Sequence, residues 1–502
     1  MDQLDSRWSL PPNVFVGGGN DKGDLMKELT FDLVCIGGGA GGLFAASVAK
    51  ALGAKTCIVE KKRLGGDCTW FGCMPSKALL KSAQTAHTLF HYAQYGLKTQ
   101  GTFGLDTGHV MAHVRDIVAE IATHHKEEDF RERGIEVIIG TPRFIDSTTL
   151  ETSEYRIKSK RFIICTGSHP VVFPIDGLKE IGYLTNETVF SLDKLPASLI
   201  VLGGGPIGVE LSQALGRLGV KINLVEMVDR ILFREEPEVS VFVENQLKAD
   251  GINLFTGRKA VRFRKEDNQV IVTVEDKNGK KEDITSENVL VAIGRAPNLE
   301  GLDLQKANVE YTPKGLKVNT YLQTTNPNIF ACGDVASPYQ FSHVAAYGAS
   351  VAVRNCLFKR LAWAKVDYNN VTWATFTDPE LAHLGLTEEE SRKQFERIKI
   401  YSTPYTNSDR AVTDLEKKGL VKVITDKKGL ILGAHVVGAH AGEIIQGFLI
   451  AKSNRIPLSK LAQTLYIYPT LSELVKKTAA KPFVEQGNNP LIKFVIKMMK
   501  NI

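Results

Sequence analysis

Residues 31–42 read FDLVCIGGGAGG, an apolar run that leads into a glycine-rich turn. An alanine-rich helical pattern and a second apolar run ending at Glu60 follow. This order predicts a strand, a turn, a helix and a strand, with Gly37 in the tight turn and Gly39 where the backbone can approach a pyrophosphate. Gly42 permits close packing of the helix. Glu60 then lies where a carboxylate can bind ribose hydroxyls, so the segment predicts a dinucleotide-binding fold.

A second unit of the same kind begins at residue 199. Its sequence LIVLGGGPIG contains Gly203, Gly205 and Gly208, and its next strand pattern ends before Glu226. One such glycine motif is weak evidence, because glycine turns between strands and helices also occur without nucleotides. Two copies with matching flanks and the same glycine-to-acid spacing predict two dinucleotides. Hydride chemistry pairs a nicotinamide donor with a flavin acceptor, so we expect FAD together with NADH or NADPH.

The acid of the second unit favours NAD. Glu226 is followed by Met227 and Val228 rather than by arginines, which suits a free ribose 2′-hydroxyl. Arg230 and Arg234 lie close in the sequence and leave NADP open.

Size and composition limit the class of protein. With 502 residues the chain exceeds the size of a single core, so two to four domains are expected. The 62 Lys and Arg against 56 Asp and Glu form no block of like charge, so nucleic acid is not expected as a partner. No apolar stretch suits a signal peptide or a membrane span, and we expect a cytoplasmic protein.

Seven cysteines are an odd and modest number, which argues against a secreted disulfide framework. Five have apolar or small neighbours and are expected to be buried thiols. These five are Cys35, Cys57, Cys165, Cys332 and Cys356.

The other two cysteines occur in residues 65–77, which read GGDCTWFGCMPSK. Cys68 and Cys73 are five residues apart, and a regular helix would separate them by about 7.5 Å, too far for a disulfide. They can pair only in a distorted turn, for which the neighbouring glycines supply freedom. A helix beginning near Pro75 would help to stabilise a thiolate at Cys73. We predict a redox-active pair; ordinary loop thiols or half of a metal site are the alternative.

With these motifs the chain resembles the class I pyridine nucleotide-disulfide oxidoreductases over about residues 31–482. The other matching motifs are Cys165-Thr166-Gly167, Gly294-Arg295-Ala296-Pro297-Asn298, Ile329-Phe330-Ala331-Cys332-Gly333-Asp334, Thr377-Asp378-Pro379-Glu380 and Gly433-Ala434-His435-Val436-Val437-Gly438. The resemblance implies an α/β fold with two Rossmann-like dinucleotide-binding domains, for FAD and NAD(P), and a C-terminal α+β dimerisation domain.

The resemblance also implies a domain order in which the FAD-binding domain is split in sequence. The expected parts are an N-terminal extension (1–29), the first part of the FAD-binding domain (30–184), the NAD(P)-binding domain (185–302), the second part of the FAD-binding domain (303–368), the dimerisation domain (369–482) and a C-terminal tail (483–502).

Site roles follow from the same resemblance. Glu60 is expected on the adenosine ribose of FAD and Asp334 near its ribityl chain. Further cofactor contacts are expected from Thr166, Gly167, Gly294, Arg295 and Gly333. Lys77 and Glu210 are expected to pair beside the flavin. The nicotinamide reduces the flavin, the flavin reduces the disulfide through Cys73, and Cys68 is the thiol that meets the substrate.

The pattern differs from that of the disulfide reductases near the C-terminus. Those enzymes have a histidine five residues before a glutamate, whereas this chain has Tyr468 before Glu473. A phenol with a pKa near 10 is a poor base at neutral pH. Mercuric reductases also have a tyrosine there, but they carry a further C-terminal cysteine pair, and no cysteine follows Cys356 here. Tyr468 is either an acid/base group or a packed interface aromatic.

These features favour a homodimeric, mercuric reductase-like enzyme, with Tyr468 and Glu473 facing Cys68 of the partner subunit. The acceptor is expected to be a small disulfide or a thiol-bound metal ion. A dihydrolipoamide dehydrogenase with Tyr468 in the acid/base position is one alternative. A flavin-binding redox sensor or interaction protein with little turnover is another. His435 and His440 are expected to be structural, and the tail is expected to pack on the body without membrane contact.

Overall fold

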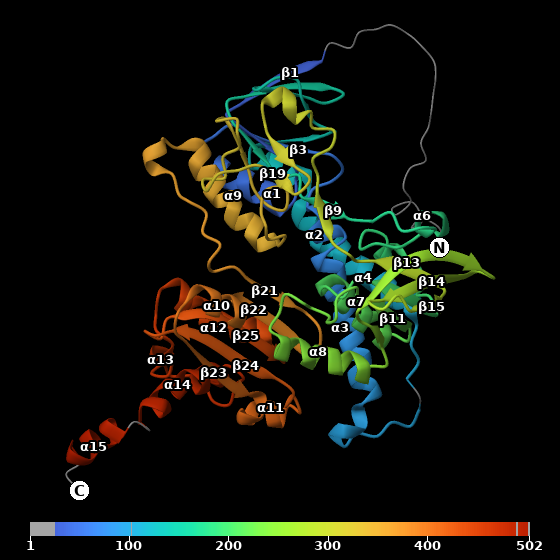
Figure 1. Ribbon diagram of the computed structural model, residues 1–502. Helices are drawn as coiled ribbons and strands as arrows, with labels where there is room; N and C mark the ends of the chain where they lie inside the picture. Colours follow the sequence, from blue (N-terminus) through green and yellow to red (C-terminus); the bar gives the residue numbers. More distant parts are fainter. Residues whose placement is uncertain (1–25, 102, 488–489, 500–502) are drawn as a thin grey trace.

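The computed structural model describes residues 26–101, 103–487 and 490–499. Three regions, each built around a β-sheet, surround the long helix α3 (Cys73–Phe90), as Figure 1 shows. The predicted N-terminal extension lies almost wholly outside the described residues. Its last residues lead into β1 (Lys27–Phe31).

The first region is a five-stranded parallel sheet. Its strands, in spatial order, are β20 (Ile329–Ala331), β8 (Phe162–Ile164), β2 (Leu33–Ile36), β3 (Thr56–Glu60) and β4 (Ile135–Ile139). All four residues of β2 are buried, as expected for a strand covered on both faces. β20 pairs with β8 at Ala331 and Ile164, so a late segment completes the sheet that the first glycine unit begins.

Helices and a smaller sheet cover this region. α1 (Ala40–Ala51) packs against α9 (Ser342–Leu357) beside the parallel sheet. The smaller sheet has the order β1, β7 (Tyr155–Ser159), β6 (Thr149–Glu151) and β5 (Arg143–Phe144).

The second region repeats the strand–turn–helix–strand order. Its parallel sheet has the order β12 (Asn253–Phe255), β11 (Lys221–Val225), β10 (Ser198–Leu202) and β16 (Asn288–Val291). An antiparallel sheet of β13 (Arg258–Glu266), β14 (Gln269–Asp276) and β15 (Lys281–Ser286) adjoins it. Its main helices are α7 (Pro206–Arg217) and α8 (Pro237–Ala249).

The two glycine units have the same backbone geometry. Gly37 has φ +106° and Gly203 has φ +104°, a conformation that favours glycine. A Cβ on Gly42 would lie 1.8 Å from the Gly37 oxygen, and a Cβ on Gly208 would lie 1.9 Å from the Gly203 oxygen. Each helix therefore approaches its turn too closely for any side chain, as predicted from the sequence.

The third region is an antiparallel sheet with helices on it. The strand order is β21 (Thr372–Thr375), β22 (Glu380–Gly385), β25 (Ile431–Gly438), β24 (Leu420–Asp426) and β23 (Ile398–Pro404). Its helices include α12 (Ala441–Ser453), α13 (Leu458–Leu461) and α14 (Glu473–Gly487). These elements share one apolar core, so the predicted α/β class with a separate C-terminal α+β region is confirmed.

The remaining helices and strands lie within or between these regions. The helices are α2 (Gly66–Trp70), α4 (Thr107–Ala122), α5 (Glu127–Glu132), α6 (Leu178–Ile181), α10 (Glu388–Gln394) and α11 (Asp409–Thr413). The strands are β9 (Ser168–Pro170), β17 (Arg295–Pro297), β18 (Tyr311–Thr312) and β19 (Gly315–Leu316). β9 pairs with β17 where the chain passes between the first two regions.

Helix α15 (Pro490–Met499) extends from the body beyond α14 in Figure 1. Phe494, Met498 and Met499 are exposed. The expectation that the tail packs on the body is therefore wrong for this helix, although its helical pattern is present. Within the described ranges, no helix is long and apolar enough to cross a membrane.

Candidate active site

A cavity of about 2840 Å³ lies between the three regions. Both glycine turns, both acids of the glycine units and the cysteine pair line it. Its volume exceeds the range of about 300–1,000 Å³ typical of a pocket for one small ligand. The cavity therefore has room for more than one extended ligand.

The first glycine turn fits a pyrophosphate. Gly39 is the N-cap of α1 and provides no side-chain hydrogen bond to the first backbone amides of the helix. Those amides suit a bound anion. At the end of β3, the Glu60 carboxylate accepts hydrogen bonds from the Gly38 amide at 2.6 Å and the Lys62 amide at 2.9 Å. These bonds hold Glu60 against the turn, where it lines the cavity.

The second turn has the same arrangement. Gly205 caps α7 without a side-chain bond, and no heavy atom lies within 4 Å of the position its Cβ would take. Glu226 accepts from the Gly204 amide at 2.6 Å and the Val228 amide at 2.9 Å. The two predicted nucleotide sites thus share one local design, and the residues present fit two dinucleotides.

The motifs after β8 and β20 meet at the same cavity. Asp334 accepts a hydrogen bond from Ser168 Oγ at 2.6 Å, and burial raises the pKa of Asp334. Thr166 Oγ1 donates to the Asn298 oxygen at 2.8 Å. Gly167 and Gly333 have φ values of +70° and +76°. Asp334, held by the bond from Ser168, lines the cavity, where a cofactor contact is expected from the sequence.

Gly294 and Arg295 precede and begin β17. Gly294 has φ +138°, and both residues line the cavity. The Arg295 guanidinium donates to Ser168 Oγ at 2.8 Å and lies 3.3 Å from the Asp67 carboxylate. Its donors are thus engaged with protein groups next to the cysteine loop. The contacts of Arg295 with Ser168 and Asp67 hold the cysteine loop in place, a role that the sequence did not predict.

Cys68 lies on α2 and Cys73 is the first residue of α3. The predicted distorted turn is present, because Phe71 and Gly72 separate the two helices. α3 begins at Cys73 rather than near Pro75, so the thiol lies at the positive helix end itself. Cys73 Sγ is 3.8 Å from Ser342 Oγ on α9.

The pKa values of the two thiols are shifted in opposite directions. A hydrogen bond from Cys68, the charge of Lys77 and a hydrogen bond from Ser342 lower the pKa of Cys73 to about 6. The bond to Cys73 and burial raise the pKa of Cys68. At neutral pH the reduced pair therefore holds a thiolate at Cys73 and a thiol at Cys68.

Lys77 and Glu210 come together across the α3–α7 contact. Lys77 Nζ lies 2.9 Å from Glu210 Oε2, and the Glu210 side chain is 7% exposed. Glu210 Oε1 accepts from the Phe376 amide at 2.8 Å. Lys77 Nζ also lies 4.4 Å from the centre of the Phe376 ring. The pair is thus held by a residue of the C-terminal region.

Tyr468 lies on the surface of the C-terminal region, and Glu473, which follows it in the sequence, is partly buried. The Tyr468 side chain is exposed, and its hydroxyl donates to Asp409 Oδ2 at 3.0 Å. This bond raises the pKa of Tyr468. Glu473 begins α14, and its Oε2 is buried without a hydrogen-bond partner among the described residues. Neither residue is among those that line the cavity with Cys68 in this chain.

The sequence missed three residues of the site. Ser342 follows the Asp334 motif and begins α9, and Phe376 adjoins the Thr377-Asp378-Pro379-Glu380 motif, so both had a nearby signal. Asp409 had none, because it comes from a separate short helix and reaches Tyr468 only in the folded chain.

The acidity of Cys73 can be tested in reduced, FAD-loaded protein. The rate of Cys73 alkylation by iodoacetamide, resolved by mass spectrometry, should rise with a midpoint near pH 6, because the thiolate forms above that pH. Lys77→Met should move the midpoint upward, since a nearby cation is lost. Lys81→Met, one turn further along α3 and exposed, is the matched control and should leave it unchanged. A wild-type midpoint of about 8.5, the ordinary thiol value, would contradict this assignment.

Comparison with known proteins identifies the family. The pyridine nucleotide-disulphide oxidoreductase model matches residues 31–349, and the dimerisation-domain model of the same family matches residues 371–479. Mercuric reductase from Lysinibacillus sphaericus is 34% identical over 459 residues, which cover 91% of this chain and 83% of that protein. Dihydrolipoyl dehydrogenase from Thermus scotoductus (strain ATCC 700910 / SA-01) is 35% identical over 455 residues, covering 90% and 97%.

A solved structure agrees with this result. The copper(II) complex of the HOCl-induced flavoprotein disulfide reductase RclA from Escherichia coli superposes with a TM-score of 0.80 at 25% identity. The match covers 90% of this chain and 99% of that one. The chain belongs to the pyridine nucleotide-disulphide oxidoreductase family and is an FAD-containing oxidoreductase that carries the family's dimerisation domain.

Proposed function

We propose that this enzyme uses NADH to reduce a thiol-bound soft metal ion through Cys68 and Cys73, as a homodimer. The observation that carries the choice of acceptor is the hydrogen bond from Tyr468 to Asp409. Because this bond raises the pKa of a phenol, Tyr468 stays protonated and cannot serve as the base that a dithiol acceptor requires. Metal–thiolate chemistry has less need of such a base. Mercuric reductases and a copper(II) complex are among the similar proteins, which supports a metal acceptor.

Different residues of the chain serve FAD binding and the chemistry of the two cysteines. Glu60, Asp334 and the first glycine turn would hold FAD, which supplies the electron relay between the nicotinamide and the cysteine pair. The hydrogen bond from Cys68 and the charge of Lys77, which pairs with Glu210, lower the pKa of Cys73 and keep its sulfur as a thiolate. Cys68 keeps its proton until an acceptor arrives, and a metal ion that binds there displaces that proton.

The overall reaction balances with one nicotinamide. NADH supplies two electrons and one proton, and one further proton comes from solution. A divalent metal ion held by two thiolates takes the two electrons, the two metal–sulfur bonds break, and two thiols are released. A disulfide acceptor takes the same two electrons and two protons as its sulfur–sulfur bond breaks.

The dimer proposal rests on exposed apolar side chains next to Tyr468. Leu465 is 96% exposed and Ile467 is 79% exposed, values that leave large apolar surface open to water. The matching dimerisation-domain model covers the same segment. A second copy that covers this segment would bring Tyr468 and Glu473 toward Cys68 of the partner subunit. We further propose that the enzyme works in the cytoplasm, where its buried thiols stay reduced.

The preference for NADH over NADPH rests on the surroundings of Glu226. Arg230 donates to the Phe233 and Glu235 backbone oxygens, each at 2.9 Å, so its guanidinium is engaged within its own loop. A 2′-phosphate would meet the Glu226 carboxylate, and of the two nearby arginines only Arg234, which is exposed and lines the cavity, is open to pair with it. The ratio of kcat/KM for NADH to that for NADPH should exceed about tenfold, and Glu226→Gln should reduce it. A ratio below one would contradict the preference.

The choice of acceptor is tested by NADH oxidation with a mercuric dithiolate, lipoamide and glutathione disulfide. The metal complex should be reduced at least tenfold faster than either disulfide. Tyr468→His should raise disulfide reduction by about 10²-fold or more, since it restores a base, and Tyr468→Phe is the matched control without one. Rapid lipoamide reduction by the wild type would favour the dihydrolipoamide dehydrogenase alternative. No turnover with any acceptor would favour a redox sensor.

A further inference from the structure

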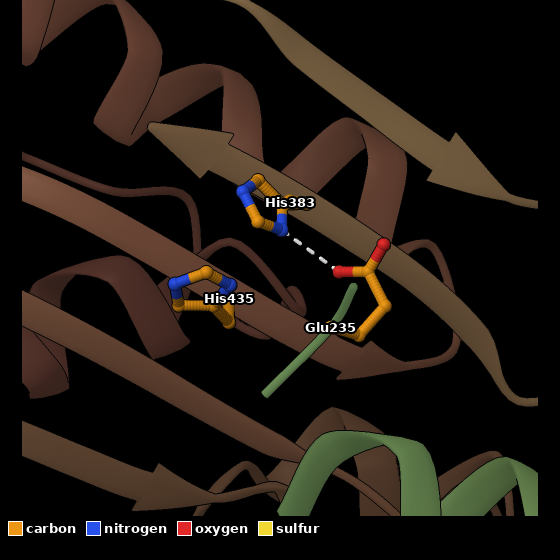
Figure 2. A group of neighbouring side chains, drawn as sticks. All are labelled: Glu235, His383 and His435. Atoms are coloured by element: carbon orange, nitrogen blue, oxygen red, sulfur yellow. Dashed lines mark hydrogen bonds and ion pairs between the residues drawn. The ribbon is translucent and has the colours of Figure 1, made fainter. Parts of the chain in front are cut away.

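Three buried side chains converge where the second and third regions meet (Figure 2). Glu235 lies in the turn that precedes α8. His383 lies on β22 and His435 on β25, and the two histidines face each other in register across the strand pair. Their exposed fractions are 4%, 2% and 1% in that order. The function proposed above uses none of them.

Hydrogen bonds fix which ring nitrogen of each histidine faces Glu235. His383 Nε2 lies 2.8 Å from the Gly385 carbonyl oxygen, and His435 Nε2 lies 3.1 Å from the Leu386 carbonyl oxygen. A carbonyl only accepts, so both Nε2 atoms carry hydrogen. In a neutral imidazole the Nδ1 atom then offers a lone pair. Two adjacent carbonyls therefore hold both rings with Nε2–H toward the backbone. The hydrogen bond between His383 Nδ1 and Glu235 Oε2 needs a further proton, which a metal ion bound there would displace.

The two Nδ1 atoms differ in their partners. His383 Nδ1 lies 2.8 Å from Glu235 Oε2. His435 Nδ1 is buried and has no hydrogen-bond partner among the described residues. A buried polar atom without a partner is destabilising, and a ligand, ion or water bound to it would remove that cost. In Figure 2 the His435 ring lies beside the Glu235–His383 pair.

We propose that Glu235, His383 and His435 bind a divalent transition-metal ion of the zinc type. Two imidazoles and one carboxylate form a ligand set typical of zinc, with a fourth position left for water. The Nε2 hydrogen bonds to backbone carbonyls are the outer contacts that orient metal-binding histidines. The three ligand atoms lie within 4.8 Å of one another. Zinc at about 2.1 Å from each ligand would draw them to roughly 3.4 Å, so the site contracts on binding.

The surrounding charges favour a cation. Lys422 is buried and contacts the carboxylates of Glu236, Glu238 and Glu388 at 2.6–2.9 Å. Arg392 contacts Glu388 as well, at 2.6 Å. Three carboxylates thus share two cations. Glu235 adds a fourth carboxylate, and Arg230 donates to its backbone oxygen, so four carboxylates face three cationic side chains. A divalent ion would offset this excess in a site of low dielectric.

The site has a route to solvent and a built-in reporter. Glu235, His383 and Trp373 line the large cavity, so an ion can enter from there. Trp373 stacks on His383 with ring centroids 3.7 Å apart, and its Nε1 donates to Glu235 Oε1 at 2.7 Å. Metal binding would therefore change the surroundings of the Trp373 indole.

The bound ion would join the two regions. Glu235 belongs to the second region and the histidines to the third, so ligation adds a bond between them in the folded state alone. Such a ligand raises stability in proportion to its occupancy. The site is independent of the acceptor proposed for Cys68 and Cys73, so either proposal can fail without the other.

The test uses full-length, FAD-loaded protein treated with EDTA and then titrated with Zn²⁺ or Co²⁺. Oxidised protein is used, with a Cys68→Ser/Cys73→Ser variant in parallel, because free cysteine thiols would also bind these ions. We expect one ion per chain and a rise in the thermal unfolding midpoint on addition of Zn²⁺. Co²⁺ should give visible bands on the long-wavelength side of the flavin absorption without a sulfur charge-transfer band, and tryptophan fluorescence should change except in Trp373→Phe.

His435→Gln and Glu235→Gln should each weaken binding more than tenfold. His113→Gln, which changes an exposed histidine on α4, is the matched control and should bind as the wild type does. Retained FAD content and circular dichroism show that each variant is folded; if His435→Gln does not fold, Glu235→Gln and the Co²⁺ spectrum decide. Absence of binding to oxidised wild type would overturn the proposal and leave a hydrogen-bonded Glu235–His383 pair. Binding lost in the double serine variant, or unchanged in the folded ligand variants, would overturn it too.

Discussion

The contact between Lys77 and Glu210 connects the three regions at the point where the chemistry occurs. Lys77 extends from the helix that begins with Cys73, and Glu210 lies on the helix of the second glycine turn. The backbone of Phe376, from the third region, binds the other oxygen of Glu210. Removing Lys77 would leave a largely buried carboxylate without its cation, which is costly. The Lys77 charge also adds to the hydrogen bond from Cys68 in lowering the pKa of Cys73, so the same lysine contributes to the arrangement of the regions and to the acidity of the redox thiol.

Much of this arrangement follows from the sequence. Close helix approach permits only glycine at positions such as Gly42 and Gly208, so the two dinucleotide units leave a local pattern that can be recognised. The split first region was implied by family resemblance, and β20 pairs with β8 in the sheet that contains the first glycine unit. The helix start at Cys73 was misplaced by two residues, because helix ends depend on neighbouring contacts as well as on local signals such as proline.

Contacts between distant segments could not be predicted. Asp409 changes the chemistry of Tyr468, yet no motif marks it, since the two residues meet only through the folding of the third region. His435 was expected to be structural, because glycines and alanines surround it in the sequence. The structure places it opposite His383 and beside Glu235, residues from three separate segments. Whether α15 packs on the body likewise depends on whether the folded chain presents an apolar surface to it. The amphipathic pattern of the helix alone does not determine this.

The proposed reaction requires that electrons pass from the nicotinamide through the flavin to the cysteine pair. Anaerobic titration of the FAD-loaded wild type and of Cys73→Ser with NADH measures it most directly, by the long-wavelength charge-transfer band between a thiolate and the flavin. Two-electron reduction should produce this band in the wild type and not in Cys73→Ser. Direct bleaching of the flavin in both proteins, with no such band in either, would contradict the role of the cysteine pair.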